Sequence, residues 1–402
     1  MFKKYIFSYR SNTFFFILAT PLIILIILLR PFIKIKIGKI NAAVIGEFLI
    51  PPENFLCELR SKKIIKKKND IFIFFCNRPI SNQYILKNWE KYFIIWPRQI
   101  VEPIYYFFID FNFFRDFLCP WRHDHLVDYN KTAFYRQITD IHNLLPNYPV
   151  TLKFDEKEIE TGEQNLLKLG YKKNQKIVCF ANRDGSFWDE EGTSTRNASI
   201  FTYKKSINYL ADKDFFNIRM GRKNYEKIDF EKKNIVDYCF SKEKSDFNDI
   251  YIFSRCEFLI STDHGINEFA TFFRKKKLVI NFETFNKLHY LDENYTPLIL
   301  PKKYLDLKTK KFVQYKEVYK KKLYDIRYKE ELNKLGYDLI DNTEDEIYKS
   351  TKEMTEIVEN KTLYEIKEQN NFWQIHKDYF NWKPKLIRIS NSFFNDNLDL
   401  FC

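Results

Sequence analysis

The chain alternates short apolar runs with amphipathic segments over most of its length, which is typical of a parallel α/β protein. Short apolar runs bounded by polar residues predict buried strands, and apolar residues recurring every three or four positions predict helices. The predicted strands lie at 32–38, 70–77, 93–97, 176–183, 216–221, 234–240, 257–262, 277–282 and 336–341. The predicted helices lie at 82–92, 103–118, 163–170, 199–214, 246–256, 265–273 and 344–358. This alternation predicts parallel sheets that carry helices on both faces.

Two local signals support the helix boundaries. Gly170 follows an amphipathic run, where a glycine commonly ends a helix, and Thr343 with Glu346 forms a capping-box pattern before the last predicted helix. The two prolines within 145–158 indicate a linker between two series of strands and helices. We therefore expect two Rossmann-like doubly wound domains, at 31–155 and 156–360, followed by a helical tail at 361–402.

The amino-terminal region contains a long uncharged stretch. No charge occurs from Ser11 to Leu29, a length that is just sufficient for a helix to cross a thin bilayer. No small-x-small cleavage site follows, so residues 1–30 are interpreted as a membrane-anchoring segment rather than a signal peptide. Whether the segment spans the membrane, inserts as a hairpin or lies in the interface stays open. More basic residues follow the segment than precede it, which predicts a location on the cytoplasmic face of the inner membrane, in contact with its lipids.

Composition narrows the function classes. Aromatic residues make up 18% and glycine occurs 9 times, which argues against disorder and low-complexity repeats. The net charge is +13, but abundant lysine together with Phe, Ile, Asn and Tyr also fits the amino-acid bias of an AT-rich genome. Nucleic-acid binding therefore rests on charge alone and is not expected. The seven cysteines contain no C-x-x-C pair and indicate a reducing compartment.

Polar residues follow four predicted strands of the second domain. The carboxyl ends of parallel strands meet at one edge of the sheet, where ligands bind and helix N-termini favour phosphate. We therefore expect one crevice that binds a phosphate or nucleotide. Ordinary turn chemistry, helix capping and strand-end salt bridges are the alternative explanation. The residues at these exits and helix starts are Arg183, Asp184, Arg196, Asn197, Arg219, Gly221, Asp237, Ser245, Asp246, Ser261, Thr262, Asp263, His264, Gly265 and Glu268.

Several catalytic motifs are missing from the sequence. It has no G-x-G-x-x-G and no P-loop motif, which argues against a nicotinamide dehydrogenase or a P-loop enzyme. It also has no G-x-S-x-G elbow. The single D-x-D, at 212–214, ends a predicted helix instead of following a strand, so no metal site is expected there. Asp124 and His125 lie in the segment 119–128, where a loop near a cleft could supply a general base.

The second domain resembles a bacterial family of predicted glycosyltransferases encoded with surface-polysaccharide and lipopolysaccharide genes. The matching segments include "ANRD", "IRMG" and "PLILPKKYLDLKTKK". They also include "STRNASIFTYKKSINYL", in which Thr195 replaces the aromatic residue usual in the family, and "FLISTDHGINEFATFF". The similarity covers most of residues 20–360.

The resemblance implies the two-domain GT-B architecture, in which two Rossmann-like halves face a cleft and the second half holds a sugar nucleotide. It implies a membrane-associated, metal-independent glycosyltransferase with a nucleotide-sugar donor, a surface-glycan or lipid-linked acceptor and no other cofactor. In that architecture Gly265 would face the diphosphate and Glu268 the ribose. Arg183, Arg196 and Arg219 would neutralise the leaving group.

The residues expected to act in catalysis are Asp124, His125, Asp263 and His264. A sugar-nucleotide epimerase on the same fold remains an alternative, although it would need no hydrophobic amino terminus. A non-catalytic scaffold of a glycan-assembly complex is another alternative, in which no nucleotide site would be used. The donor sugar, the acceptor, the stereochemistry and the oligomeric state do not follow from the sequence.

Overall fold

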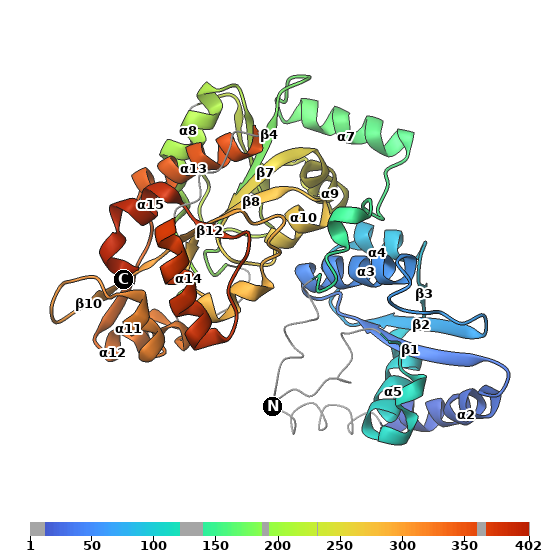
Figure 1. The fold of residues 1–402 in the computed structure, drawn as a ribbon. Coiled ribbons are helices and arrows are strands. Elements are labelled where there is room, and N and C mark those ends of the chain that lie inside the picture. Colours follow the sequence, from blue (N-terminus) through green and yellow to red (C-terminus); the bar gives the residue numbers. More distant parts are fainter. Residues whose placement is uncertain (1–12, 121–139, 187–192, 231, 360–366, 402) are drawn as a thin grey trace. The chain divides into compact units, whose positions relative to one another are not determined.

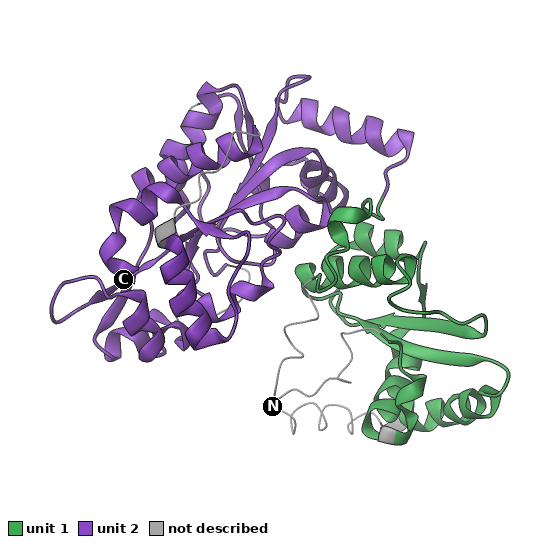
Figure 2. Cartoon of the chain, in the orientation of Figure 1, with its two compact units in different colours: residues 1–152 green, residues 153–402 purple. Residues whose placement is uncertain are grey.

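The chain forms two compact units, residues 1–152 (unit 1) and 153–402 (unit 2), which are coloured separately in Figure 2. The computed structural model describes residues 13–120, 140–186, 193–230, 232–359 and 367–401, and Figure 1 labels many of their elements.

Unit 1 is built around a parallel sheet of three strands in the order β1-β2-β3. Successive side chains of a strand point to opposite faces of a sheet. Ile37, Ile73 and Phe75 therefore pack against the helices α2 and α5, whereas Phe72 and Phe74 contact Phe55 of helix α3 on the other face. The elements of unit 1 are α2 (Thr13–Leu29), β1 (Lys34–Ile40), α3 (Ile45–Arg60), β2 (Asp70–Cys76), α4 (Gln83–Trp89), β3 (Ile94–Ile95), α5 (Arg98–Asp110) and the 3-10 helices at Asn112–Phe117 and Leu145–Asn147.

Helix α2 is apolar on both of its sides. It buries Ala19, Ile23 and Ile26 in the core that it shares with α5. Its remaining apolar side chains include several that are at least half exposed, namely Ile17, Leu18, Ile24, Leu25 and Leu28. In the part of the chain that the structure describes, no helix combines the length and the apolar character needed to cross a membrane.

Unit 2 contains a sheet of seven parallel strands in the order β12-β9-β8-β7-β4-β5-β6. The chain starts at the centre, adds strands on one side and then continues from β7 on the other side. The topological switch point of this doubly wound sheet therefore lies between β4 and β7. The strands are β4 (Ile177–Ala181), β5 (Phe216–Arg219), β6 (Ile235–Asp237), β7 (Cys256–Ser261), β8 (Lys276–Phe282), β9 (Leu298–Pro301) and β12 (Arg388–Ile389).

Helices cover both faces of this sheet, as the sequence predicts. Helices α8 and α13 pack together on one face, while α9 lies between α7 and α10 on the other. The helices of unit 2 are α7 (Glu156–Lys168), α8 (Lys204–Asp212), α9 (Asp246–Arg255), α10 (Asn267–Phe272), α11 (Tyr315–Lys320), α12 (Lys329–Lys334), α13 (Glu344–Val358), α14 (Lys367–Phe380) and α15 (Asn391–Asp396). Short 3-10 helices lie at Ile200–Tyr203, Tyr238–Phe240, Phe285–Tyr290, Leu323–Asp325 and Leu398–Leu400.

Both local helix signals are confirmed. The side chain of Thr343 accepts a hydrogen bond from the Glu346 backbone N–H, and the Glu346 carboxylate accepts one from the Thr343 N–H, so the capping box is complete. Gly170 follows the end of α7 with φ of +95°, a left-handed conformation that glycine adopts at little cost.

The strand expected at 336–341 does not join the large parallel sheet, contrary to the prediction from sequence. The segment does form a strand, β11 (Tyr337–Ile340), but β11 pairs antiparallel with β10 (Lys303–Asp306) in a separate two-stranded sheet. Strand β10 begins only two residues after β9 ends, too few for the crossover that a further parallel strand would need.

Other elements differ from the predicted pattern in extent. Helix α5 begins at Arg98 and ends at Asp110, with a 3-10 helix after it, where one helix at 103–118 was expected. Helix α3 was not predicted, because Pro51 and Pro52 lie in its interior, where proline removes a helix hydrogen bond. The tail contains helices and also strand β12, which adds to the edge of the large sheet.

Candidate functional site

The carboxyl ends of β4 and β7 lie side by side at the switch point of unit 2. The backbone N–H of Arg183, after β4, donates to Thr262 Oγ1, after β7, over 3.0 Å. The Arg183 carbonyl accepts a hydrogen bond of 2.9 Å from the Ala198 N–H. Three segments that are far apart in the sequence, near residues 183, 196 and 262, therefore meet at this edge, as the sequence predicts for parallel strands.

Two of the predicted arginines are partly exposed there. Arg183 Nη1 donates to Asn197 Oδ1 over 2.6 Å. Arg196 directs Nε and Nη2 at the Asp263 carbonyl, with Nε at 3.1 Å, and Nη2 lies 3.7 Å from Asp263 Oδ2. The Arg196 side chain is 35% exposed, and among the described residues its Nη1 has no hydrogen-bond partner. A partly exposed guanidinium with a donor to spare suits an anionic ligand.

The turn from Ser261 to Gly265 is held by hydrogen bonds of its own side chains and of Asn267, the first residue of α10. Ser261 Oγ donates to Asn267 Oδ1, and Asn267 Nδ2 donates to the Thr262 carbonyl over 3.1 Å. His264 Nδ1 lies 2.8 Å from the same carbonyl and so carries the proton as donor, which leaves Nε2 as an acceptor. Burial lowers the pKa of His264 to about 4, which keeps the ring neutral near pH 7.

Asp263 contacts two neighbours at this edge. Its Oδ2 accepts a hydrogen bond of 2.5 Å from Thr284 Oγ1, just after β8, and its backbone carbonyl holds Arg196. Ser261 and Thr262 are fully buried, whereas Asp263, His264 and Gly265 remain partly exposed. The structure therefore brings Arg183, Arg196 and the exposed part of the 261–265 turn into one polar cluster.

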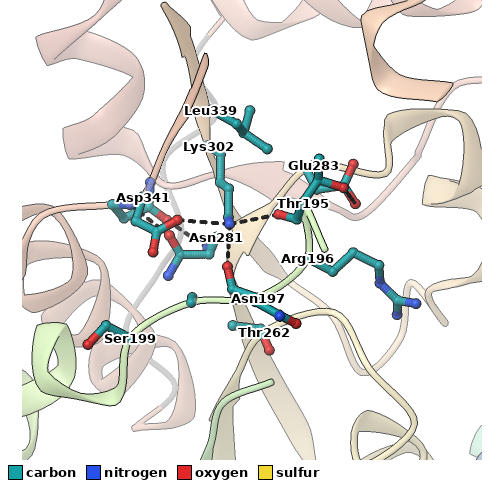
Figure 3. Close-up of polar contacts among 12 residues, drawn as sticks. Thr195, Arg196, Asn197, Ser199, Thr262, Asn281, Glu283, Lys302, Leu339 and Asp341 are labelled. Carbon is teal, nitrogen blue, oxygen red and sulfur yellow. Dashed lines mark hydrogen bonds and ion pairs between the residues drawn. The ribbon is translucent and has the colours of Figure 1, made fainter. Parts of the chain in front are cut away.

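Two charged residues of this cluster were not predicted. Lys302, directly after β9, is fully buried, and its Nζ lies 2.8 Å from the Thr195 carbonyl, 2.6 Å from the Asn197 carbonyl and 2.8 Å from Asp341 Oδ1 (Figure 3). Glu283, directly after β8, is 3% exposed and accepts a hydrogen bond of 3.3 Å from Thr195 Oγ1. Burial raises the pKa of Glu283 to about 7, although Arg196 acts in the opposite direction. Their positions at strand exits were the available signal.

Arg219 and Asp237 form a buried ion pair within the protein. Arg219 has no exposed surface, and its Nη1 lies 3.1 Å from Asp237 Oδ2 while its Nη2 donates to Asn182 Oδ1. Asp237 also accepts a hydrogen bond from the Ile228 N–H. This is the strand-end salt bridge that the sequence left open as the alternative to ligand binding.

Other predicted residues are occupied by turns and helix caps. Asp184 accepts hydrogen bonds from the Ser186 and Tyr225 N–H groups, at 3.0 and 2.9 Å. Ser245 caps α9 by accepting from the Asn248 N–H, and Asp246 lies in the first turn of that helix. The Gly221 carbonyl accepts a hydrogen bond from Lys244.

Glu268 lies in the first turn of α10, and its side chain is largely buried. Its Oε1 lies 4.0 Å from Nζ of the fully buried Lys277, and Lys277 also donates to Thr271 Oγ1 over 2.7 Å. Burial raises the pKa of Glu268, and Lys277 opposes this rise. Lys277 is thus an internal partner for the Glu268 carboxylate.

Unit 1 also ends its strands in polar side chains. Asn77, after β2, accepts hydrogen bonds from the Ala42 and Ala43 N–H groups and donates to Asn41, after β1. Asn41 in turn donates to Glu47 Oε2 on α3 over 2.5 Å. Asp124 and His125 lie outside the described residues. Within the described ranges, no group of three or more His, Cys, Asp and Glu side chains could hold a metal ion.

Comparisons with known proteins give distant structural likenesses. No protein-family model matches the chain, and no curated protein matches it in sequence. The structure is similar to a glycosyl transferase family 9 protein of Veillonella parvula DSM 2008, at 12% identity and a TM-score of 0.37 over 61% of this chain and 80% of that chain. It is also similar to the E. coli ADP-heptose lps heptosyltransferase II, at 10% identity and a TM-score of 0.33 over 61% and 84%. A third similar structure is the wall teichoic acid polymerase TagF, at 11% identity and a TM-score of 0.25 over 74% of this chain and 69% of that chain. At these identities and TM-scores, no family is established for this chain.

Proposed function

We propose that this protein is a glycosyltransferase that moves a sugar from a nucleotide-sugar donor to a surface-glycan or lipid-linked acceptor. The observation that carries the proposal is the pair of partly exposed arginines, Arg183 and Arg196, beside the 261–265 turn at the switch point of a doubly wound sheet. Ligands of such sheets bind at this edge. The sequence motifs that resemble predicted glycosyltransferases of surface-polysaccharide gene clusters include both arginines and this turn.

The donor diphosphate would bind to the guanidinium groups of Arg183 and Arg196. Cleavage of the bond between the sugar and the diphosphate leaves negative charge on the phosphate oxygen, and fixed cationic donors stabilise that charge as it develops. His264 is neutral near pH 7 and offers Nε2 as a hydrogen-bond acceptor for a donor hydroxyl. No metal ion is required in this scheme.

The acceptor hydroxyl must lose a proton when it attacks the sugar, so a general base is needed. Asp124 and His125 remain the bases predicted from sequence.

The first experiment is a thermal-shift screen of the full chain against UDP, GDP, CDP and ADP and their sugar conjugates. We expect one nucleoside family to raise the melting temperature, because a ligand that binds only the folded state stabilises it. Release of that diphosphate from its sugar conjugate, with octyl glycosides as acceptors, then tests transfer. If no nucleotide stabilises the protein, the donor-site assignment is wrong, and if binding occurs without turnover, the scaffold alternative gains support.

We also propose that the protein acts on the cytoplasmic face of the inner membrane, held there by α2. The support is the apolar outer side of this helix together with the basic residues of unit 1. An apolar helix face in a basic surrounding favours the interface of an anionic bilayer.

A further inference from the structure

Lys302 is a buried cation that donates hydrogen bonds to two backbone carbonyls of the segment 195–197. Its side chain has no exposed surface, and burying an ammonium group is costly unless its donors are satisfied. Three oxygens surround Nζ: the carbonyls of Thr195 and Asn197 and the carboxylate of Asp341 (Figure 3). The two carbonyls accept hydrogen bonds from the ammonium group, and the Asp341 carboxylate is its ion-pair partner.

The two carbonyls belong to the residues on either side of Arg196. Lys302 therefore fixes the backbone immediately before and immediately after this arginine. In Figure 3 the Arg196 side chain extends away from Lys302. Its Nε donates a hydrogen bond of 3.1 Å to the Asp263 carbonyl. The segment has further anchors at its ends, where the Thr195 N–H donates to the Arg327 carbonyl and the Ala198 N–H donates to the Arg183 carbonyl.

We propose that Lys302 is the positioning residue for Arg196, and that it presents this guanidinium, already ordered, to the diphosphate of a nucleotide ligand. The inference rests on the proposed function, because it assigns a phosphate-bearing ligand to the same edge. Lys302 itself does not touch the ligand. Its contribution is to remove the cost of ordering residues 195–197 when the ligand binds.

The charge arrangement supports a positioning role. The Asp341 carboxylate lies 2.8 Å from Lys302 Nζ and balances its charge inside the protein. Lys302 is therefore already paired and is not expected to bind a ligand directly. The Arg196 guanidinium lies 3.7 Å from the Asp263 carboxylate, and its side chain is 35% exposed. The two cations thus differ in role: Lys302 binds the backbone carbonyls, and the Arg196 side chain is partly exposed to solvent.

The test compares two variants, Lys302→Met and Lys303→Met. The quantity compared is the ratio of the affinity for a nucleoside diphosphate to the affinity for its nucleoside. Lys303, the next residue, forms an ion pair of 2.6 Å with Glu346 and packs on Phe312 and Phe393, away from residues 195–197. Both variants remove one paired lysine from the same stretch of chain. Titration calorimetry would give the affinity of the full chain for UDP, GDP, CDP or ADP, whichever binds, and for the corresponding nucleoside.

We expect Lys302→Met to weaken diphosphate binding at least tenfold and to change nucleoside binding less than twofold. Lys303→Met should leave the ratio of the two affinities unchanged. A general loss of structure would weaken both ligands together. If Lys302→Met keeps the wild-type ratio, or if Lys303→Met loses it equally, Lys302 has no special role at this site.

A second variant covers the case in which Lys302→Met does not fold. Asp341→Asn keeps an oxygen acceptor for Lys302 but removes the balancing charge, and we expect a roughly threefold loss of diphosphate affinity with a cooperative melt. An unchanged affinity in Asp341→Asn would then overturn the inference. If the wild-type chain shows no preference for the diphosphate over the nucleoside, the proposed donor site itself is wrong. This outcome differs from one in which the wild type has the preference and the variants keep it, which would overturn only the role of Lys302.

Discussion

Glu283 is a buried carboxyl group whose pKa is raised by its surroundings. It is a carboxyl group with 3% exposure, and one hydroxyl, Thr195 Oγ1, donates to it. Burial raises its pKa from 4.5 to about 7. In the unfolded chain the same group loses its proton near its ordinary pKa. Between these two values the folded state binds a proton that the unfolded state releases, so folding is less favourable as the pH rises through this window.

Replacing Glu283 by Gln should remove this pH dependence while keeping an oxygen that accepts from Thr195. Relative to wild type, we expect Glu283→Gln to gain about 1–3 kcal/mol in the free energy of unfolding at pH 8 and little at pH 5. Urea unfolding of both proteins at the two pH values measures the difference. An equal difference at both pH values would show that Glu283 is not held in its protonated form.

At the scale of elements, the β4 exit depends on a left-handed glycine. Gly185 has φ of +86°, and a Cβ built there would lie 2.9 Å from Asn197 Nδ2. Asn197 is the residue that accepts from Arg183 Nη1. Gly336 has the same φ, but no atom lies within 4 Å of a Cβ built there. A substitution at Gly336 therefore measures the cost of the left-handed backbone alone.

We expect Gly185→Ala and Gly336→Ala to lose a similar amount of stability, about 1 kcal/mol each, from the left-handed backbone. Only Gly185→Ala should weaken nucleoside diphosphate binding, because its methyl group displaces Asn197 and with it Arg183. Thermal melts and titration calorimetry measure the two effects. Equal diphosphate affinity in the two variants would mean that Asn197 does not hold Arg183 for the ligand.

The same elements show what the sequence could predict. Apolar runs such as 176–183 and 277–282, and local caps such as Thr343 with Glu346, depend on neighbouring residues and were predicted correctly. Strand β11 was recognised but placed in the wrong sheet, since pairing depends on partners distant in sequence. Helix α3 was missed because tertiary packing outweighs the local penalty of Pro51 and Pro52.

Prediction of the candidate site has the same limit. The polar exits of β4 and β7 revealed Arg183, Arg196 and the 261–265 turn, because strand ends can be recognised in a sequence. Whether a charged side chain there faces solvent or an internal partner depends on the assembled sheet. For this reason the sequence did not separate Arg196 from the buried Arg219, and the positions of Lys302 and Glu283 at strand exits were not enough to show that they join the cluster.

At the scale of the whole molecule, the net charge of +13 and the exposed apolar side of α2 make association with an anionic bilayer the expected behaviour. The double variant Ile17→Glu with Leu28→Glu places charge on two side chains that are 64% and 67% exposed, so it should spare the core of unit 1. We expect it to reduce co-sedimentation with vesicles containing phosphatidylglycerol at least fivefold. Phe201→Glu, an exposed aromatic residue of unit 2, is the control. Equal losses in both variants would leave α2 without a special role.

In the proposed function, the carboxyl edge of the unit 2 sheet binds the diphosphate of a nucleotide through Arg183 and Arg196. The most direct measurement is titration calorimetry of the full chain with the nucleoside diphosphate found in the screen and with its nucleoside, in wild type and in Arg183→Gln with Arg196→Gln. We expect wild type to prefer the diphosphate at least tenfold, and the double variant to lose this preference while it still binds the nucleoside. If wild type lacks the preference, or if the double variant keeps it, Arg183 and Arg196 do not form a diphosphate site.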